Sequence, residues 1–223
     1  MSVAAFAAPV QTDAATVSME APSPESAGSL TRYTLAPEGS LLGVVVYYKR
    51  GGLLSRFAHD HVLVASRFDG DVVWDSDDVS RCEIAIAVPL NALVVDPGQS
   101  RTIVGIDPKD TVGEGSKQQI LVNAFSEKQM HAAKFPDVRF DSTSCEAAEN
   151  GVLVKGALTI RGLSVPVRVL AEVTADGERF EAKGSFDLNH KSLGFRPYSN
   201  GLLSNDDPLR FVLDLKGSVP TAP

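Results

Sequence analysis

Residues 151–173 read GVLVKGALTIRGLSVPVRVLAEV and carry the clearest structural pattern of the chain. Apolar residues alternate there with polar ones on both sides of a short turn at Gly162-Leu163-Ser164. The apolar positions are Val152, Val154, Leu158 and Ile160 before the turn and Val165, Val167 and Val169 after it. This period of two predicts an antiparallel β-hairpin with one apolar and one wet face.

The same alternation recurs on both sides of the hairpin. A turn at Asp176-Gly177 leads into another strand, and a last strand is expected at about residues 209–215. The inward positions expected in the other strands are Leu42, Val44, Val46, Tyr48, Phe68, Val72, Trp74, Cys82, Ile84, Ile86, Val88, Leu90, Val138, Phe140, Phe180, Ala182, Gly184, Phe186 and Leu188. Repeated strands separated by turn residues predict an antiparallel, mainly β protein.

Helical spacing is confined to residues 116–133. Within them, Ser126 and Gln129 form a capping-box pattern that predicts a second short helix, which must end before Phe135-Pro136. One short helical insertion in a β chain indicates a lid or plug on a barrel.

The composition excludes several classes of protein. The chain has 223 residues, a net charge of -7 and no Lys/Arg-rich run, which argues against binding nucleic acid or an anionic membrane. No stretch approaches about 18 consecutive apolar residues, so no integral membrane segment is predicted. The patterned region fits a single domain over residues 30–219.

Residues 1–29 are rich in Ala, Ser and Pro and lack periodicity, which is typical of a disordered leader. Ala5-Phe6-Ala7 is similar to the end of a signal peptide, but the basic region and most of the apolar region are missing. Two interpretations stay open. The protein is cytoplasmic with a disordered tail, or the segment is the remnant of an export signal and the protein is periplasmic or secreted.

Cys82 and Cys145 both fall in expected strands. They are either two buried free thiols or, if the protein is exported and those strands pair, a cross-strand disulfide. Their number and separation do not resemble a metal site.

Four motifs in order resemble the YceI-like family. Residues 158–167, LTIRGLSVPV, are similar to its L-T-I-R-G-V-T-x-P-V hairpin, and residues 134–143, KFPDVRFDST, to K-Y-P-x-I-x-F-x-S-T. Residues 188–195, LNHKSLGF, follow I-N-R-S-D-F-G-I, and residues 33–37, YTLAP, match the opening Y-x-L-D-P. Together these motifs cover about residues 30–217.

The resemblance implies an eight-stranded lipocalin-like β-barrel with a helical insertion, often exported to the bacterial periplasm. It also implies binding of polyisoprenoid chains, including quinone-type tails, and members that can form homodimers. No nucleophile motif or phosphate loop is present, so we expect a lipid-binding protein without a cofactor rather than an enzyme. The expected lining residues are Leu42, Val44, Val46, Tyr48, Phe68, Val72, Trp74, Phe140, Leu158, Ile160, Phe186 and Leu188.

The sequence departs from the family pattern near the expected barrel mouth. Gly39-Ser40 replaces the usual H-S, Tyr48 aligns with a second common histidine, and His190 replaces the arginine of I-N-R. A segment ending in His59-Asp60-His61 replaces a short polar stretch. These changes bear on the ligand more than on the fold.

His59, His61 and His190 are the candidates for polar chemistry. On a strand, His59 and His61 would project to one face, which could begin a zinc or copper site with a third ligand from His190, His131 or a carboxylate. This is the alternative hypothesis, a metal-binding barrel that acts as a hydrolase or redox accessory. Otherwise the three histidines hydrogen-bond the head group of the lipid or the backbone at the mouth.

Overall fold

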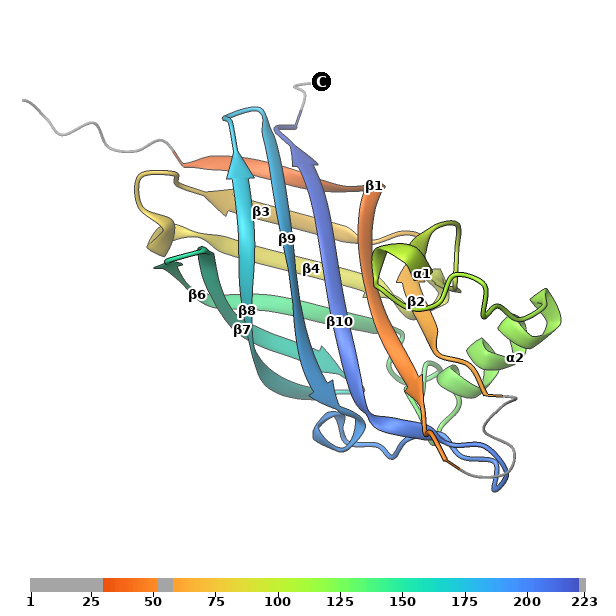
Figure 1. The fold of residues 1–223 in the computed structure, drawn as a ribbon. Coiled ribbons are helices and arrows are strands. Elements are labelled where there is room, and N and C mark those ends of the chain that lie inside the picture. The colour runs from red at the N-terminus through yellow and green to blue at the C-terminus, as the bar shows by residue number, and fades with distance from the viewer. Residues whose placement is uncertain (1–29, 52–57, 221–223) are drawn as a thin grey trace, which may run out of the picture.

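The structure is a computed structural model that describes residues 30–51 and 58–220 (Figure 1). The expected leader, residues 1–29, lies outside the described residues, as do residues 52–57 and 221–223. No helix in the described part is long and apolar enough to cross a membrane.

Ten strand segments dominate the fold. They are β1 (Thr31–Tyr48), β2 (His61–Ala65), β3 (Asp69–Trp74), β4 (Glu83–Pro89), β5 (Leu93–Val95), β6 (Asp137–Ala148), β7 (Gly151–Ile160), β8 (Leu163–Ala175), β9 (Arg179–Asn189) and β10 (Asn205–Ser218). The helices are α1 (Ser100–Ile103) and α2 (Glu114–Phe125), with short 3₁₀ turns η2 (Val79–Arg81), η3 (Leu90–Ala92) and η4 (His190–Leu193).

The ten segments form the wall of a closed eight-stranded barrel. β3 pairs with the first part of β1 and β2 with a later part, so β2 and β3 are two halves of one wall strand. β4 pairs with β3, and β5 pairs with β2. β4 and β5 therefore form the next wall strand, which η3 interrupts. Antiparallel pairing continues through β6 to β10, and β10 pairs with β1 to close the barrel. The predicted antiparallel eight-stranded barrel is confirmed.

The hairpin of residues 151–173 consists of β7 and β8, with its turn one residue earlier than predicted. Arg161 and Gly162 both have positive φ, 54° and 74°, and Leu163 already belongs to β8. A Cβ at position 162 would lie 2.7 Å from the ring of Phe135. Glycine is therefore required there both for the turn and for the approach of that ring.

The helical insertion differs from the prediction. α2 is the only helix of residues 114–136, and the expected second helix, after Ser126, is wrong. The amide of Met130 bonds the carbonyl of Ala124, and His131 adopts a positive φ of 51°, so the chain turns back at the end of α2. α1 was not predicted, because its four residues are too few to show a helical period.

Cys82 and Cys145 form a disulfide, with Cα atoms 6.0 Å apart. Cys82 immediately precedes β4 and Cys145 lies in β6, so the bridge joins two paired strands. Of the two states that the sequence left open, the structure has the bridged one.

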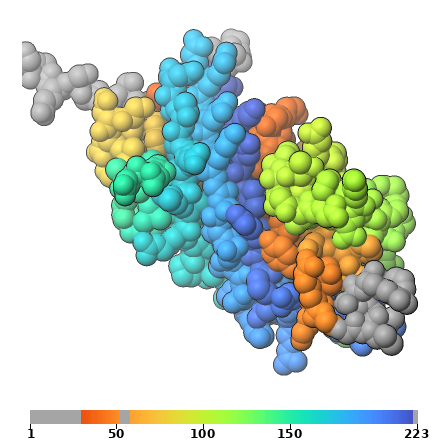
Figure 2. Space-filling model, in the orientation of Figure 1, coloured from red at the N-terminus to blue at the C-terminus, as the bar shows by residue number. Residues whose placement is uncertain are grey.

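A small apolar layer covers the outside of the barrel. Leu41, Val45, Val62 and Val64 point outward from β1 and β2 and are buried against Val104 and Ile106, beyond α1. Figure 2 shows the segment of α1 and α2, in green, packed against β1 and β2, in orange. Apolar residues on both faces of β1 are thus explained by two different environments, the barrel interior and this outer layer.

Candidate ligand-binding cavity

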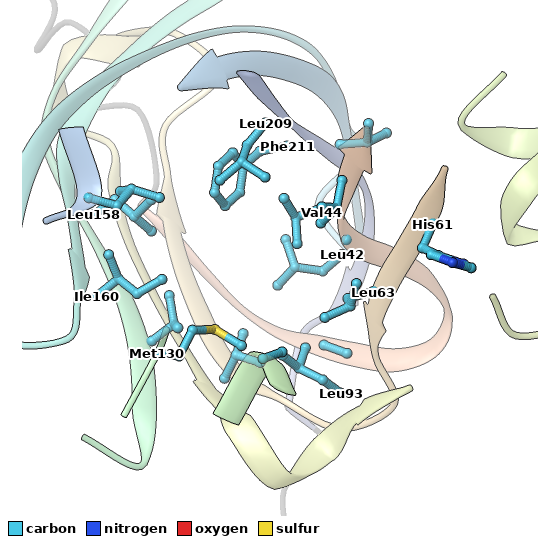
Figure 3. A pocket seen from close by; sticks show the side chains of 18 of the residues that line it. Leu42, Val44, His61, Leu63, Leu93, Met130, Leu158, Ile160, Leu209 and Phe211 are labelled. Atoms are coloured by element: carbon cyan, nitrogen blue, oxygen red, sulfur yellow. The ribbon is translucent and has the colours of Figure 1, made fainter. Parts of the chain in front are cut away.

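The barrel encloses a cavity of about 690 Å³. Figure 3 shows apolar side chains from opposite walls directed toward this space, among them Leu42 and Val44 from β1, Leu158 from β7 and Phe211 from β10. The cavity reaches the end of the barrel that α2 borders, since Ile120 and Ala124 of this helix are part of its lining. We call this end the mouth.

Nine of the twelve expected lining residues lie on the cavity wall. They are Leu42, Val44, Val46, Tyr48, Val72, Phe140, Leu158, Ile160 and Phe186. Because strand side chains alternate between faces, the sequence pattern identified the face to which they belong.

Phe68, Trp74 and Leu188 do not line the cavity. Trp74 is buried beside Phe180 at the closed end of the barrel, and Phe68 is buried in the same core cluster, between β2 and β3. Leu188 packs against the cluster that contains Leu209. All three are apolar positions of the expected kind, but alternation does not show which apolar residues border an open cavity and which pack into the core.

The deep end of the cavity is wholly apolar. Its lining there comes from Val72 of β3, Val173 of β8, Phe180 and Ala182 of β9 and Leu215 of β10. Beneath it, Phe180 contacts Tyr33 and Trp74, with ring centroids 5.5 Å and 5.7 Å away. This packing closes the barrel at the end remote from the mouth.

Polar lining residues come from the helical insertion and from the strand ends and loops at the mouth. Those not predicted from the sequence are Ser116, Gln119, Asn123, Gln129, Arg139, Tyr198, Asn200, Ser204 and Asn205. Most lie where no alternation exists to reveal an inward face. None of the described residues that line the cavity is Asp or Glu, although the chain as a whole is acidic.

His59 and His61 lie at the mouth and each binds a different carboxylate. Nδ1 of His61 is 2.8 Å from Oδ2 of Asp96, and Nδ1 of His59 bonds Asp110. Both histidines border the cavity, but Figure 3 shows the ring of His61 turned away from its centre.

Arg101 links these two pairs. Its Nη1 donates to Asp96 at 3.1 Å and to the carbonyl of Asp60 at 2.6 Å, and its Nη2 lies 3.9 Å from Asp110. We refer to His59, His61, Asp96, Arg101 and Asp110 as the mouth cluster. It ties the start of β2 to the segment between β5 and α2.

The environment of Asp96 favours its charged form. Burial raises the pKa of this carboxyl, but the hydrogen bonds from His61 and from the amide of Val62, with the charges of His61 and Arg101, outweigh burial and lower the pKa overall. Asp96 is therefore a buried carboxylate whose charged form is stabilised by hydrogen bonds from His61, the amide of Val62 and Arg101.

His190 also lines the cavity, and only 3% of its surface is exposed. Its Nδ1 is 2.8 Å from the carbonyl of Asp207, and because a carbonyl only accepts, Nδ1 donates there. Burial lowers the pKa of His190, outweighing the Asp207 carbonyl and the charges of Asp207 and Asp206, which raise it. The neutral ring thus keeps Nε2 as a hydrogen-bond acceptor.

The geometry gives no support to the metal hypothesis. The ring centroids of His59 and His61 are 6.1 Å apart, and each Nδ1 is engaged by its own aspartate. Within residues 30–51 and 58–220, no three His, Cys, Asp or Glu side chains are grouped as a metal site would require. The cluster is organised as two His–Asp hydrogen bonds and the Arg101–Asp96 ion pair, which hold the mouth together.

Solved structures share the fold. BcnA of Burkholderia cenocepacia superposes with a TM-score of 0.58 at 14% identity, covering 82% of this chain and 98% of that one. The YCEI protein of Campylobacter jejuni gives 0.51 at 13% identity, with coverage of 70% and 82%. No curated protein matches the sequence.

Residues 33–215 match the profile of the YceI-like domain, which spans the whole barrel from β1 to β10. Barrels of this family are generally associated with the binding of hydrophobic ligands and are typically not catalytic. The order of the four sequence motifs, the closed eight-stranded barrel and this match lead to one conclusion: the chain belongs to the YceI-like domain family.

Proposed function

We propose that this protein binds a long-chain isoprenoid or similar lipid in the barrel and carries or sequesters it. The observation that supports this most directly is the cavity of about 690 Å³, apolar along its depth and polar only toward the mouth. Such a gradient suits a molecule with a long apolar tail and a small polar head.

Burial of the tail would supply the binding energy. Each buried CH₂ contributes about 0.8 kcal/mol, so a tail of many carbons binds tightly without specific polar contacts. The association of the family with hydrophobic ligands agrees with this source of affinity.

The head group is expected at the mouth, near His59, His61 and His190. His190 offers Nε2 as an acceptor, and the amides of Gln119 and Asn123 add both donors and acceptors. A head group that bears hydroxyl or carbonyl oxygens fits these partners.

Solvent extraction of the purified protein followed by mass spectrometry tests the proposal. We expect a co-purified lipid, and displacement of a bound fluorescent apolar probe by a prenyl alcohol. Ala171→Trp, which fills the cavity, should abolish probe binding. Leu170→Trp, on the exposed outer face of the same strand, should leave binding unchanged. No extracted lipid and no probe binding by the wild-type protein would refute the proposal.

We further propose that the protein is exported to an oxidising compartment such as the periplasm. The disulfide between Cys82 and Cys145 supports this, because such bridges persist mainly outside the cytosol. Fractionation of the native cells should place the protein in the periplasmic or secreted fraction with both thiols unreactive. Recovery from the cytoplasm with two titratable thiols would contradict export.

A further inference from the structure

Three aromatic side chains close the cavity at its deep end. Phe180 contacts both Tyr33 and Trp74, and none of the three is more than 5% exposed. Only Phe180 lines the cavity, whereas Tyr33 and Trp74 lie behind it. We call these three residues the aromatic floor.

The strand register holds the aromatic floor in place. Tyr33 pairs with Val72 across β1 and β3, and Phe180 pairs with Gly217 across β9 and β10. Residues directly opposite in an antiparallel pair share a face, so Gly217 leaves room beside the ring of Phe180. Leu35 occupies part of that room, with Cδ2 3.1 Å from where a Cβ at position 217 would lie.

The distance from the floor to the mouth is fixed by β9. Phe180 and Asn189, at the end of this strand, are nine residues apart. That separation is about 30 Å along the strand and about 23 Å along the barrel axis at the usual tilt of ~40°. An extended tail longer than this must fold back or leave the barrel.

We propose that the aromatic floor limits the length of the tail that the cavity accepts, with Phe180 as the residue that the end of the tail meets. The inference rests on the proposed function. It adds that selectivity among lipids of one chemical type is set at the closed end of the barrel, by tail length.

Affinities of a series of all-trans prenyl alcohols, each one isoprene unit longer than the last, test this limit. For the wild-type protein each unit should raise the affinity by at least about tenfold until the tail reaches Phe180. Beyond that length the affinity should level off or fall.

Phe180→Leu replaces the ring by a smaller side chain, which deepens the cavity at its closed end and should move the length limit to a longer tail. Phe68→Leu is the matched control, since Phe68 is buried in the same core but does not line the cavity. Val173→Phe adds a ring just above the floor and should move the limit to a shorter tail. The two cavity variants have opposite expected shifts, so poor folding of either one leaves the test intact.

The outcomes separate this inference from the proposed function. If the wild-type protein binds no prenyl alcohol, both fail. If it binds them without any length limit, or if the limit is the same in Phe180→Leu, Val173→Phe and Phe68→Leu, the proposed function stands and the aromatic floor does not select tail length. Opposite shifts in the two cavity variants, with none in Phe68→Leu, support the inference.

Discussion

Arg101 is buried where three parts of the mouth meet. It bonds Asp96 at the end of β5, the carbonyl of Asp60 beside β2, and through Nε the carbonyl of Asp107 at 2.7 Å. The side chain of Asp96 is fully buried. Loss of the guanidinium would therefore leave a buried carboxylate with less charge compensation.

We predict that Arg101→Met lowers the free energy of unfolding by about 3 kcal/mol, as removal of one partner of a buried ion pair does. Urea denaturation measures this. Arg50→Met is the control: Arg50 pairs with Asp60 but its side chain is 74% exposed, so the loss should stay below about 1 kcal/mol. Equal losses in the two variants would contradict the role given to Arg101.

His190 makes stability depend on pH. Because burial lowers its pKa in the folded protein, the unfolded chain takes up this proton at higher pH than the folded one. Its contribution to stability is fully present above about pH 6.5, the ordinary value for histidine, and is lost as the pH falls toward the lowered pKa. The lowered pKa of Asp96 acts in a separate window, below about pH 4.

We predict that the free energy of unfolding decreases between about pH 7 and pH 5 and that His190→Gln removes most of this decrease. Denaturant titrations at a series of pH values measure the slope. His131→Gln, at the turn after α2, should retain the wild-type slope. A slope that is unchanged in His190→Gln would show that another group carries the dependence.

At the scale of elements, the disulfide fastens β4 to β6. Cys82 and Cys145 are 63 residues apart in sequence, and closing a loop of that size stabilises a protein by about 4 kcal/mol in the chain-entropy model. The double variant Cys82→Ser with Cys145→Ser should unfold at correspondingly lower urea concentration. Reductant should destabilise the wild-type protein and leave the double variant unaffected; insensitivity of the wild-type protein would exclude a structural bridge.

β6 and β7 approach closely at Gly156. A Cβ there would lie 2.5 Å from the ring of Phe140 and 2.6 Å from the carbonyl oxygen of Asp141, so backbone and ring would both have to move. Since Phe140 lines the cavity, a shift of its ring changes the cavity wall.

We predict that Gly156→Ala lowers the free energy of unfolding by about 1–3 kcal/mol, as overpacking does, and weakens lipid binding. Gly115→Ala in α2 meets no atom within 4 Å and should stabilise the protein by about 0.5–1 kcal/mol. Thermal unfolding and probe binding measure both. A Gly156→Ala protein with wild-type stability would contradict the close contact.

At the scale of the whole molecule, alternation predicted the barrel but not its interruptions. Val72 follows the alternating strand pattern, whereas residues 61–65, HVLVA, do not alternate, yet β2 and β3 form one wall strand. Where a strand breaks depends on its partners, and a single segment does not contain that information.

The cavity wall was largely predictable and the mouth was not. Leu158 and Ile160 were placed on the wall by the alternation of apolar residues, whereas Trp74, which the same alternation pointed inward, lies behind Phe180 in the aromatic floor and does not line the cavity. Asp96, Arg101 and Asp110 come from a segment without a periodic pattern, so their meeting with His59 and His61 depends on tertiary packing. The absence of Asp and Glu from the described cavity lining likewise emerges only once the fold has placed the acidic residues on other surfaces.

A crystal structure of the protein incubated with a prenyl alcohol would show whether the barrel holds an extended lipid tail. We predict continuous elongated density between Val44 and Leu158, with the head group near His190 and the end of the tail against Phe180. A barrel interior filled by its own side chains, or a lipid bound only on the outer surface, would contradict it.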